Sequence, residues 1–452
     1  MKFKANLAWI DGAWASNVFL ESDAQGFWTH IQTNATDAES QGALALGCVI
    51  PGLVNAHSHA FQRAIAGLTE HSERSGDDFW SWRDRMYRVA LRVSPDHLES
   101  IATWLYSEML RSGYTHVCEF HYLHRNPDGH EYADPAEMTW ALVRAAENTG
   151  IGLTMLPTLY MNQGFGQPGL NSMQRRFAST PDSILNLQQA VLRHAKINSR
   201  QSNLNAGVAI HSLRAVAPAE IVGLTSQSGS APVHIHIAEQ TKEVADCLAH
   251  TGLRPVEWLL ANANLDARWN LVHATHASAS EIQGIQAQQA SVVICPTTEA
   301  NLGDGFFNLT EAMQQSMRWS IGTDSHVNRN WSEELRLLEY GGRLSLRKRN
   351  VGLLHKNGCG STGQVLFENA LQGGSQAAGL PMAGIAIQQR ADLLEIDLES
   401  DSLLGVPSER FMDALIFSTP SNNFKSVFVA GKKIEHNSVQ WRADFVKTMA
   451  EL

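Results

Sequence analysis

The feature that most constrains the fold of this 452-residue chain is a set of short, β-branched apolar segments that alternate with longer segments of helical periodicity. Such an alternation is typical of repeated strand–helix units that build a parallel sheet. We count eight apolar segments, and eight strand–helix units predict a closed TIM (β/α)8 barrel. The segments are CVIPGLVNAHSH, THVCEFHY, GIGLTMLPTLY, NAGVAIHSL, APVHIHIAE, WNLVHATH, ASVVICPTTE and RWSIGTDSH.

The two ends of the chain carry a different pattern, in which strand-like segments are not followed by long helices. Residues 5–14 alternate around the turn dipeptide Asp11-Gly12, which favours a hairpin, and strand-like segments return at 391–397 and 426–434. We therefore predict one small, β-sandwich-like domain assembled from both termini. The predicted division is 1–48 for its N-terminal part, 49–383 for the barrel and 384–452 for its C-terminal part.

Charge and cysteine content limit the classes of partner and compartment. The chain has 35 Lys and Arg against 45 Asp and Glu, a net charge of −10, which disfavours nucleic acid or an acidic membrane as the partner. Five scattered cysteines without a CxxC pair predict neither a disulfide framework nor a cysteine zinc site. This cysteine usage predicts a reduced, cytoplasmic location, and because we find no signal peptide and no apolar run long enough to cross a bilayer, we expect a soluble protein.

Metal-competent residues stand at the ends of most predicted strands, on the face where barrel enzymes build their active sites. The first segment ends in His57 and His59, and residues two apart on a strand point to the same side. Taken alone, such a pair is commonly two solvated or core histidines. In the fifth segment we predict His236 as the third ligand, although spacing alone leaves His234 as the alternative, and Asp324 in GTDSH supplies a carboxylate. This set suits zinc and leaves one position for water.

Two further polar residues near the predicted ligands are candidates for acid–base chemistry. Glu239 follows His236 by three residues, and His273 closes the sixth segment in LVHATH. Singly, a glutamate after a strand is usually solvated and a histidine of this kind is usually a hydrogen-bonded core residue. Their place at the ends of adjacent strands favours the catalytic interpretation.

Together these motifs resemble the amidohydrolase superfamily and, within it, the formimidoylglutamate deiminase family. The superfamily resemblance covers essentially the whole chain through PGLVNAHSHA, HIHIAE, VHATH and GTDSH, and the narrower one rests on HAFQRAIAG, FWSWRDRMYR, EFHY, HSLRAV and GTDSHV. It implies one zinc ion per chain, with another divalent metal such as Fe²⁺ as the alternative, held by His57, His59, His236 and Asp324. The fourth segment, NAGVAIHSL, lacks the bridging lysine or glutamate of binuclear relatives, which also favours one metal.

The resemblance further implies hydrolysis of N-formimino-L-glutamate to N-formyl-L-glutamate and ammonia in histidine degradation. Asp324 or His273 would accept the proton of the attacking water, and Glu239 would deliver a proton to the departing nitrogen. The sequence leaves open which of the first two acts. The expected substrate contacts are Gln62, Arg83, Tyr122, His211 and Arg214, where Arg83 has a surface position on an amphipathic helix as its competing interpretation.

Two other functions are compatible with parts of the pattern. Another mononuclear aminohydrolase, acting on a purine, pyrimidine or triazine ring, would keep the zinc site but should lack paired arginines for a dicarboxylate. Arg83 and Arg214 therefore disfavour it. A noncatalytic zinc-binding scaffold would leave Glu239 and His273 unexplained.

Two long loops follow predicted strands on the active-site side, at residues 70–94 and 161–181, and we expect them to act as lids. For the assembly we expect a homodimer, because the two-fold dimer is the commonest closed assembly.

Overall fold

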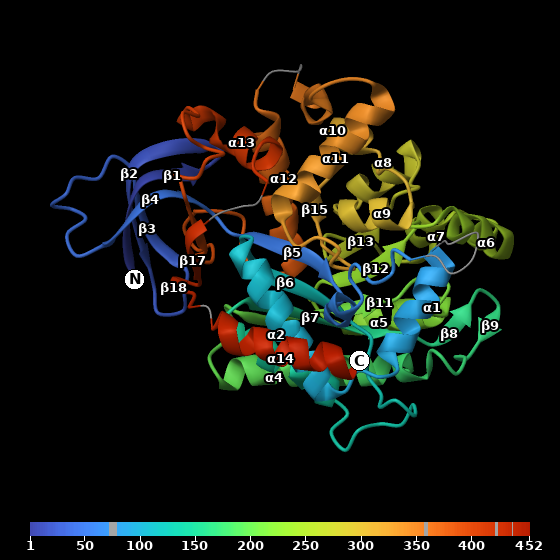
Figure 1. Ribbon diagram of the computed structural model, residues 1–452. Coiled ribbons are helices and arrows are strands. Elements are labelled where there is room, and N and C mark those ends of the chain that lie inside the picture. Colours follow the sequence, from blue (N-terminus) through green and yellow to red (C-terminus); the bar gives the residue numbers. More distant parts are fainter. Residues whose placement is uncertain (72–78, 357–359, 421–423, 436) are drawn as a thin grey trace.

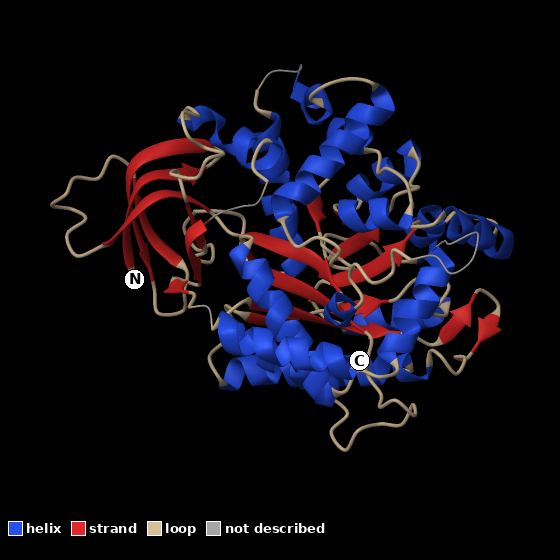
Figure 2. Cartoon of the chain, in the orientation of Figure 1, coloured by secondary structure: helices blue, strands red, loops and turns tan. Residues whose placement is uncertain are grey.

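The computed structural model describes residues 1–71, 79–356, 360–420, 424–435 and 437–452. Eight parallel strands form a nearly closed barrel surrounded by helices (Figures 1 and 2), which confirms the predicted fold. In spatial order the strands are β5 (Leu53–Ser58), β6 (Tyr114–His121), β7 (Gly152–Leu159), β11 (Val208–Ile210), β12 (Val233–Ile237), β13 (Trp269–His273), β14 (Ser291–Ile294) and β15 (Trp319–Ile321), and β10 (Leu204–Ala206) also pairs with β7.

The barrel strands are buried on both faces, which explains why they are almost continuously apolar. Every residue of β6 and β7 is buried. Several of the helices that follow begin with proline at the first turn, where its missing N–H costs no hydrogen bond. The helices of the barrel are α2 (Pro95–Arg111), α3 (Glu137–Thr149), α4 (Pro181–Ile197), α5 (Pro218–Gln227), α6 (Thr241–Thr251), α7 (Pro255–Asn262), α8 (Ala279–Ala287), α9 (Pro296–Leu302), α10 (Leu309–Gln314), α11 (Trp331–Leu346) and α12 (Thr362–Ala378).

The two chain ends build one seven-stranded sheet beside the barrel, as predicted (Figure 1). Its order is β18 (Lys432–Lys433), β17 (Phe424–Val429), β16 (Leu393–Ile396), β4 (Leu44–Ile50), β1 (Lys2–Ile10), β2 (Ala13–Ser22) and β3 (Trp28–Gln32). All neighbours are antiparallel except β1 and β4. Asp11 and Gly12 both have positive φ and close the predicted β1–β2 hairpin, as a two-residue turn of this kind requires.

The C-terminal helix α14 (Ser438–Glu451) leaves this sheet and lies along the barrel helix α2 (Figure 1). The rings of Trp104 on α2 and Phe445 on α14 stack with centroids 6.0 Å apart. A second short helix, α13 (Phe411–Phe417), packs on α11 and α12. The domain limits at 1–48, 49–383 and 384–452 stay a prediction.

The two segments predicted as lids contain regular structure. Helix α1 (Phe79–Ala90) occupies much of the first, whose residues 72–78 lie outside the described part of the chain. The second contains β8 (Asn162–Gly164), β9 (Gln167–Pro168) and the short 3-10 helix Arg175–Phe177. Across the described ranges, no helix has the length and apolar character needed to span a bilayer.

The barrel closes where β5 meets β15, through a single bridge between Ser58 and Asp324. The backbone N–H of Asp324 donates to the carbonyl of His57 at 3.0 Å, and the N–H of His59 donates to the carbonyl of Asp324 at 3.3 Å. We call this contact the seam. Gly322 lies against it, because a Cβ at that position would lie 2.6 Å from Cβ and 2.8 Å from N of His57. The backbones can approach this closely only with glycine at residue 322.

Gly322→Ala should therefore open the seam. We expect the overpacking to lower the free energy of unfolding by about 1 to 3 kcal/mol and to weaken metal binding, measured by urea unfolding and elemental analysis. Gly223→Ala on α5 is the control, because an added Cβ there would point into open space. A Gly322→Ala protein with wild-type stability and metal content would show that the seam has room for a methyl group.

Candidate active site

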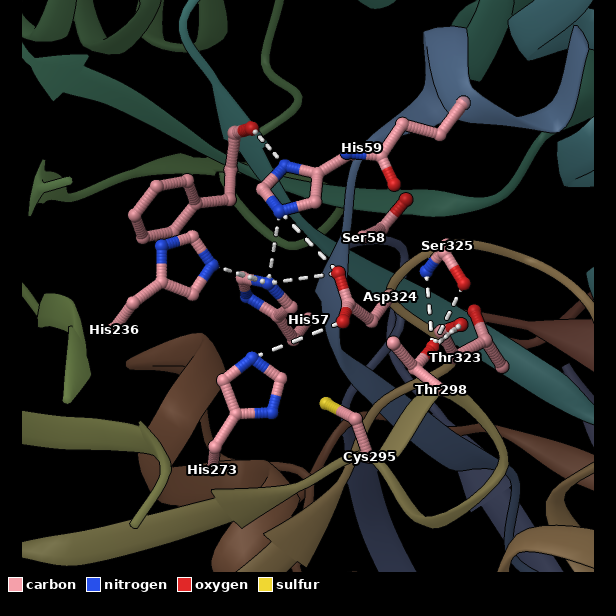
Figure 3. Close-up of polar contacts among 12 residues, drawn as sticks. His57, Ser58, His59, His236, His273, Cys295, Thr298, Thr323, Asp324 and Ser325 are labelled. Carbon is pink, nitrogen blue, oxygen red and sulfur yellow. Dashed lines mark hydrogen bonds and ion pairs between the residues drawn. The ribbon is translucent and has the colours of Figure 1, made fainter. Parts of the chain in front are cut away.

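Three histidines from two strands point their Nε2 atoms at one place inside the C-terminal end of the barrel (Figure 3). His57 Nε2 lies 3.1 Å from His59 Nε2 and 3.0 Å from His236 Nε2. Asp324 Oδ1 lies 3.4 Å from His57 Nε2 and 3.3 Å from His59 Nε2. Ligands about 2.0 to 2.1 Å from a tetrahedral metal ion lie roughly 3.3 to 3.4 Å from one another. The four side chains thus have the spacing and donor chemistry to hold one metal ion.

Hydrogen bonds orient two of the rings for this role. The Nδ1–H of His59 donates to the carbonyl of Phe120 at 2.9 Å, and that of His236 donates to the carbonyl of His211 at 2.9 Å. With the proton held on Nδ1, the Nε2 lone pair faces the common centre. Burial lowers the pKa of His57 and His236 well below the ordinary value, so both rings are neutral, the form that binds metal.

The alternative third histidine, His234, lies elsewhere. Its ring is fully buried, and its Nε2–H donates to the carbonyl of Ala377 at the end of α12, at 3.0 Å. The structure therefore brings His236, and not His234, to the cluster.

The three residues predicted for proton transfer lie together at the edge of the metal cluster. His273 Nε2 is 3.7 Å from Glu239 Oε1 and 3.8 Å from Asp324 Oδ2. Burial raises the pKa of Glu239 to about 7. Burial alone would lower the pKa of His273, but the charge of Glu239 and hydrogen bonds to Cys295 and Glu299 raise it well above the ordinary value. The Glu239 carboxylate thus stabilises the protonated form of His273, and the two groups form an acid–base pair beside the cluster.

The backbone at these strand ends is held in the left-handed region. Ala238, His273 and Asp324 have φ values of 51°, 69° and 46°. Residues other than glycine adopt this conformation at a cost of about 1 to 3 kcal/mol each when it is strained. The surrounding hydrogen bonds maintain it, and the sharp turns direct the side chains of His273 and Asp324 toward the cluster.

All five residues predicted to bind substrate line one pocket together with His59, His236, Glu239, His273 and Asp324. Gln62 donates to the hydroxyl of Tyr122 at 3.1 Å. Arg214 lies 3.5 Å from the hydroxyl of Tyr160.

Arg83, on α1, lies over the ring of Trp80 at 4.6 Å and faces the pocket. The side chain of Arg83 is 22% exposed, so it forms a pocket wall and not an open surface. The remaining predicted contact, His211, is the residue whose carbonyl holds His236.

Sequence reasoning missed Glu243, a buried carboxylate on α6 that also lines the pocket. Its two oxygens accept the backbone N–H groups of Ala238 at 3.1 Å and Glu239 at 3.0 Å, which fixes the turn that carries Glu239. Glu243 follows Glu239 by four residues in the sequence. This short spacing, which can bring two side chains close together, was the signal that could have identified Glu243.

Sequence reasoning also missed a hydrogen-bonded group formed by Tyr87, Tyr160 and Gln174. The hydroxyls of Tyr87 and Tyr160 lie 3.4 Å apart, and Gln174 donates to Tyr160 at 2.9 Å. These residues come from α1, the end of β7 and the 161–181 segment. Tyr160 ends its predicted strand segment and could have been found, whereas nothing in the sequence links the other two.

A buried carboxylate supports the backbone that carries the first two predicted ligands. Glu119, in the EFHY motif, accepts a hydrogen bond from Ser58 Oγ at 2.6 Å, from the N–H of Ala60 at 2.6 Å and from the hydroxyl of Tyr106 at 3.1 Å. Ser58 lies between the two ligand histidines in the chain, so this network fixes the end of β5.

Comparisons with known proteins find relatives over most of the chain. The pattern of the amidohydrolase family matches residues 48–434. A formimidoylglutamate deiminase from Pseudomonas aeruginosa is 45% identical over 430 residues, which cover 95% of this chain and 93% of the relative. The 5-methylthioadenosine/S-adenosylhomocysteine deaminase of Lawsonia intracellularis is 23% identical over 418 residues, which cover 90% and 84% of the two chains.

The crystal structure of an amidohydrolase from Brucella melitensis is 39% identical to this chain and superimposes with a TM-score of 0.93, over 100% of this chain and 99% of that one. The matched family pattern spans most of the chain. The resemblance inferred from the motifs is therefore confirmed, and the chain belongs to the amidohydrolase family.

Proposed function

We propose that this protein is a zinc-dependent hydrolase that converts N-formimino-L-glutamate to N-formyl-L-glutamate and ammonia, a step in histidine degradation. One observation carries the proposal: a single pocket contains both the metal-competent cluster and two guanidinium groups, Arg83 and Arg214. The identity of 45% to a formimidoylglutamate deiminase over nearly the whole chain supports the same reaction.

The charge of the substrate explains the two arginines. N-formimino-L-glutamate carries two carboxylates, and a protein of net charge −10 must hold them with local cations. Guanidinium pairs with a carboxylate through two parallel hydrogen bonds, which fixes orientation as well as charge. In the proposed complex Arg214 and His211 bind one carboxylate and Arg83 binds the other. Gln62 and Tyr122 complete the contacts near the formimino group.

A bound zinc ion supplies a Lewis acid that makes water acidic enough to lose a proton near neutral pH. His57, His59, His236 and Asp324 would hold it. Asp324 or His273 accepts the proton of the attacking water as its oxygen adds to the imino carbon. Glu239 then delivers a proton to the departing nitrogen, the carbon–nitrogen bond breaks, and ammonia leaves behind a formyl group.

The other candidate functions account for fewer residues. A purine or triazine ring carries no carboxylate, so a ring deaminase would leave Arg83 and Arg214 in its pocket without a substrate carboxylate to bind. A 5-methylthioadenosine/S-adenosylhomocysteine deaminase is the more distant of the two named deaminases, at 23% identity. A noncatalytic zinc scaffold would need neither Glu239 nor His273.

We also propose that the enzyme acts in the cytoplasm as a homodimer, with a small-molecule dicarboxylate as its substrate and without nucleic acid or membrane as a partner. The acidic net charge supports the last two points.

The active enzyme should contain one metal ion per chain, because the cluster offers four ligands around one centre. Elemental analysis of His236→Ala should show a strong loss of metal and activity. His234→Ala is the matched control from the same strand and should retain its metal. Two metal ions in fully active enzyme, or full metal content in His236→Ala, would contradict the assignment.

Glu239→Gln should keep its metal and lose turnover, because glutamine has the shape of glutamate but cannot accept and return a proton. We expect kcat to fall on the order of 10² to 10⁴, as is typical for a general acid–base group. Steady-state ammonia release and elemental analysis on the same sample separate the two effects. Near-normal turnover would remove Glu239 from the mechanism.

Arg83→Met and Arg214→Met should each lower kcat/KM by an amount equivalent to roughly 2 to 5 kcal/mol, because each leaves a desolvated carboxylate unpaired. Metal content should not change. N-formiminoglycine, which lacks the second carboxylate, provides the control: one of the two variants should hydrolyse it as well as wild type does. The proposal fails if both variants keep full efficiency, or if wild type deaminates a purine and releases no ammonia from N-formimino-L-glutamate.

A further inference from the structure

A second group of metal-competent side chains lies directly beside the first. His273, Cys295 and Asp324 are all buried, and their ligand atoms lie within 4.8 Å of one another. They come from the ends of three adjacent strands, β13, β14 and β15. Figure 3 shows the sulfur of Cys295 pointing toward the ring of His273, whose other face is turned to Asp324 through Nε2. The proposed function uses His273 and Asp324 but assigns no role to the thiol.

We propose that His273, Cys295 and Asp324 form a second, inhibitory metal site, which binds a thiophilic dication such as zinc or cadmium when that ion is in excess. The site itself follows from the three side chains. Its inhibitory effect rests on the proposed function, in which His273 and Asp324 accept protons.

The donor set matches this class of ion. Thiolate and imidazole are preferred ligands of zinc, and a carboxylate oxygen commonly completes such sites. Asp324 has one oxygen for each centre, because Oδ1 faces His57 and His59 while Oδ2 lies 3.8 Å from His273 Nε2. One carboxylate can therefore bridge two ions, which in two-metal sites lie about 3.5 to 4 Å apart.

The environment holds two of the three ligands in place. Glu299 Oε1 accepts the backbone N–H of Cys295 at 2.9 Å and lies 3.2 Å from His273 Nδ1. The second ring nitrogen, Nε2, is thereby directed toward Asp324. Glu239 Oε1 lies 3.7 Å from the same nitrogen and is available as a fourth ligand. A bridging carboxylate on the fourth strand is not required, because Asp324 takes that place.

Binding at this site would stop proton transfer. Coordination needs a thiolate and an unprotonated ring nitrogen, so the proton of the Cys295 thiol and any proton on His273 Nε2 pass to solvent as the ion binds. The ion then occupies His273 Nε2 and Asp324 Oδ2. Neither remains free to accept the proton of water, and the first metal ion stays in place.

The test is metal titration of the one-metal enzyme, with wild type, Cys295→Ser and Cys118→Ser compared. Cys118 is the matched control, a fully buried cysteine on barrel strand β6 outside the cluster. Wild type and Cys118→Ser should take up a second zinc ion as activity is lost. In Cys295→Ser the half-inhibiting zinc concentration should rise more than about tenfold, since even loss of an outer partner of a metal ligand costs roughly 10- to 100-fold in affinity.

Cobalt provides a readout that needs no substrate and does not depend on how well a variant folds. The second equivalent of Co²⁺ added to wild type should produce a thiolate-to-cobalt charge-transfer band, and the first should not. This result would stand even if N-formimino-L-glutamate were not the substrate. The inference is overturned if wild type binds no second ion in excess zinc, if Cys295→Ser is inhibited like wild type, or if the second cobalt ion shows no thiolate band.

Discussion

The structure depends on the backbone contact that closes the barrel between β5 and β15. The N–H of Asp324 donates to His57, and the N–H of His59 donates to Asp324, so the same two hydrogen bonds that complete the sheet also bring three predicted ligands together. The fourth, His236, arrives from a strand on the far side of the barrel order. The metal-competent cluster lies on the seam, so the contacts that close the barrel also set the geometry of the site. Gly322, which allows the two backbones to approach, is needed for both.

Burial gives this site its chemistry. It holds the ligand histidines in the neutral form, and it brings the pKa of Glu239 to about 7, where a carboxyl group can both donate and accept a proton. The positive φ values of His273 and Asp324 show that the fold maintains an unfavourable backbone to aim these groups. The same convergence of strand ends that brings Glu239, His273 and Asp324 together also places Cys295 beside them.

Much of this could be predicted from the sequence, since it follows from local pattern. Strand periodicity places His57 and His59 on one side, and barrel topology brings Asp324 to the same end. Periodicity could not separate His234 from His236, because both face the same side of β12 and differ by roughly 6.6 Å of depth. The structure separates them, because the ring of His234 donates a hydrogen bond to the carbonyl of Ala377 and is not directed at the cluster. The hydrogen bond that Gln174 donates to the hydroxyl of Tyr87, at 3.4 Å, joins two distant segments, and no pattern in either segment predicts it.

The central claim is that the seam creates a metal centre from His57, His59, His236 and Asp324. A crystal structure of the zinc-loaded protein, with anomalous diffraction measured at the zinc edge, tests it most directly. The account predicts one strong peak about 2.0 to 2.2 Å from three imidazole Nε2 atoms and one oxygen of Asp324 in protein loaded with a single equivalent. A single peak bound by His273 and Cys295 with the three histidines unliganded, or a peak at His234, would contradict it.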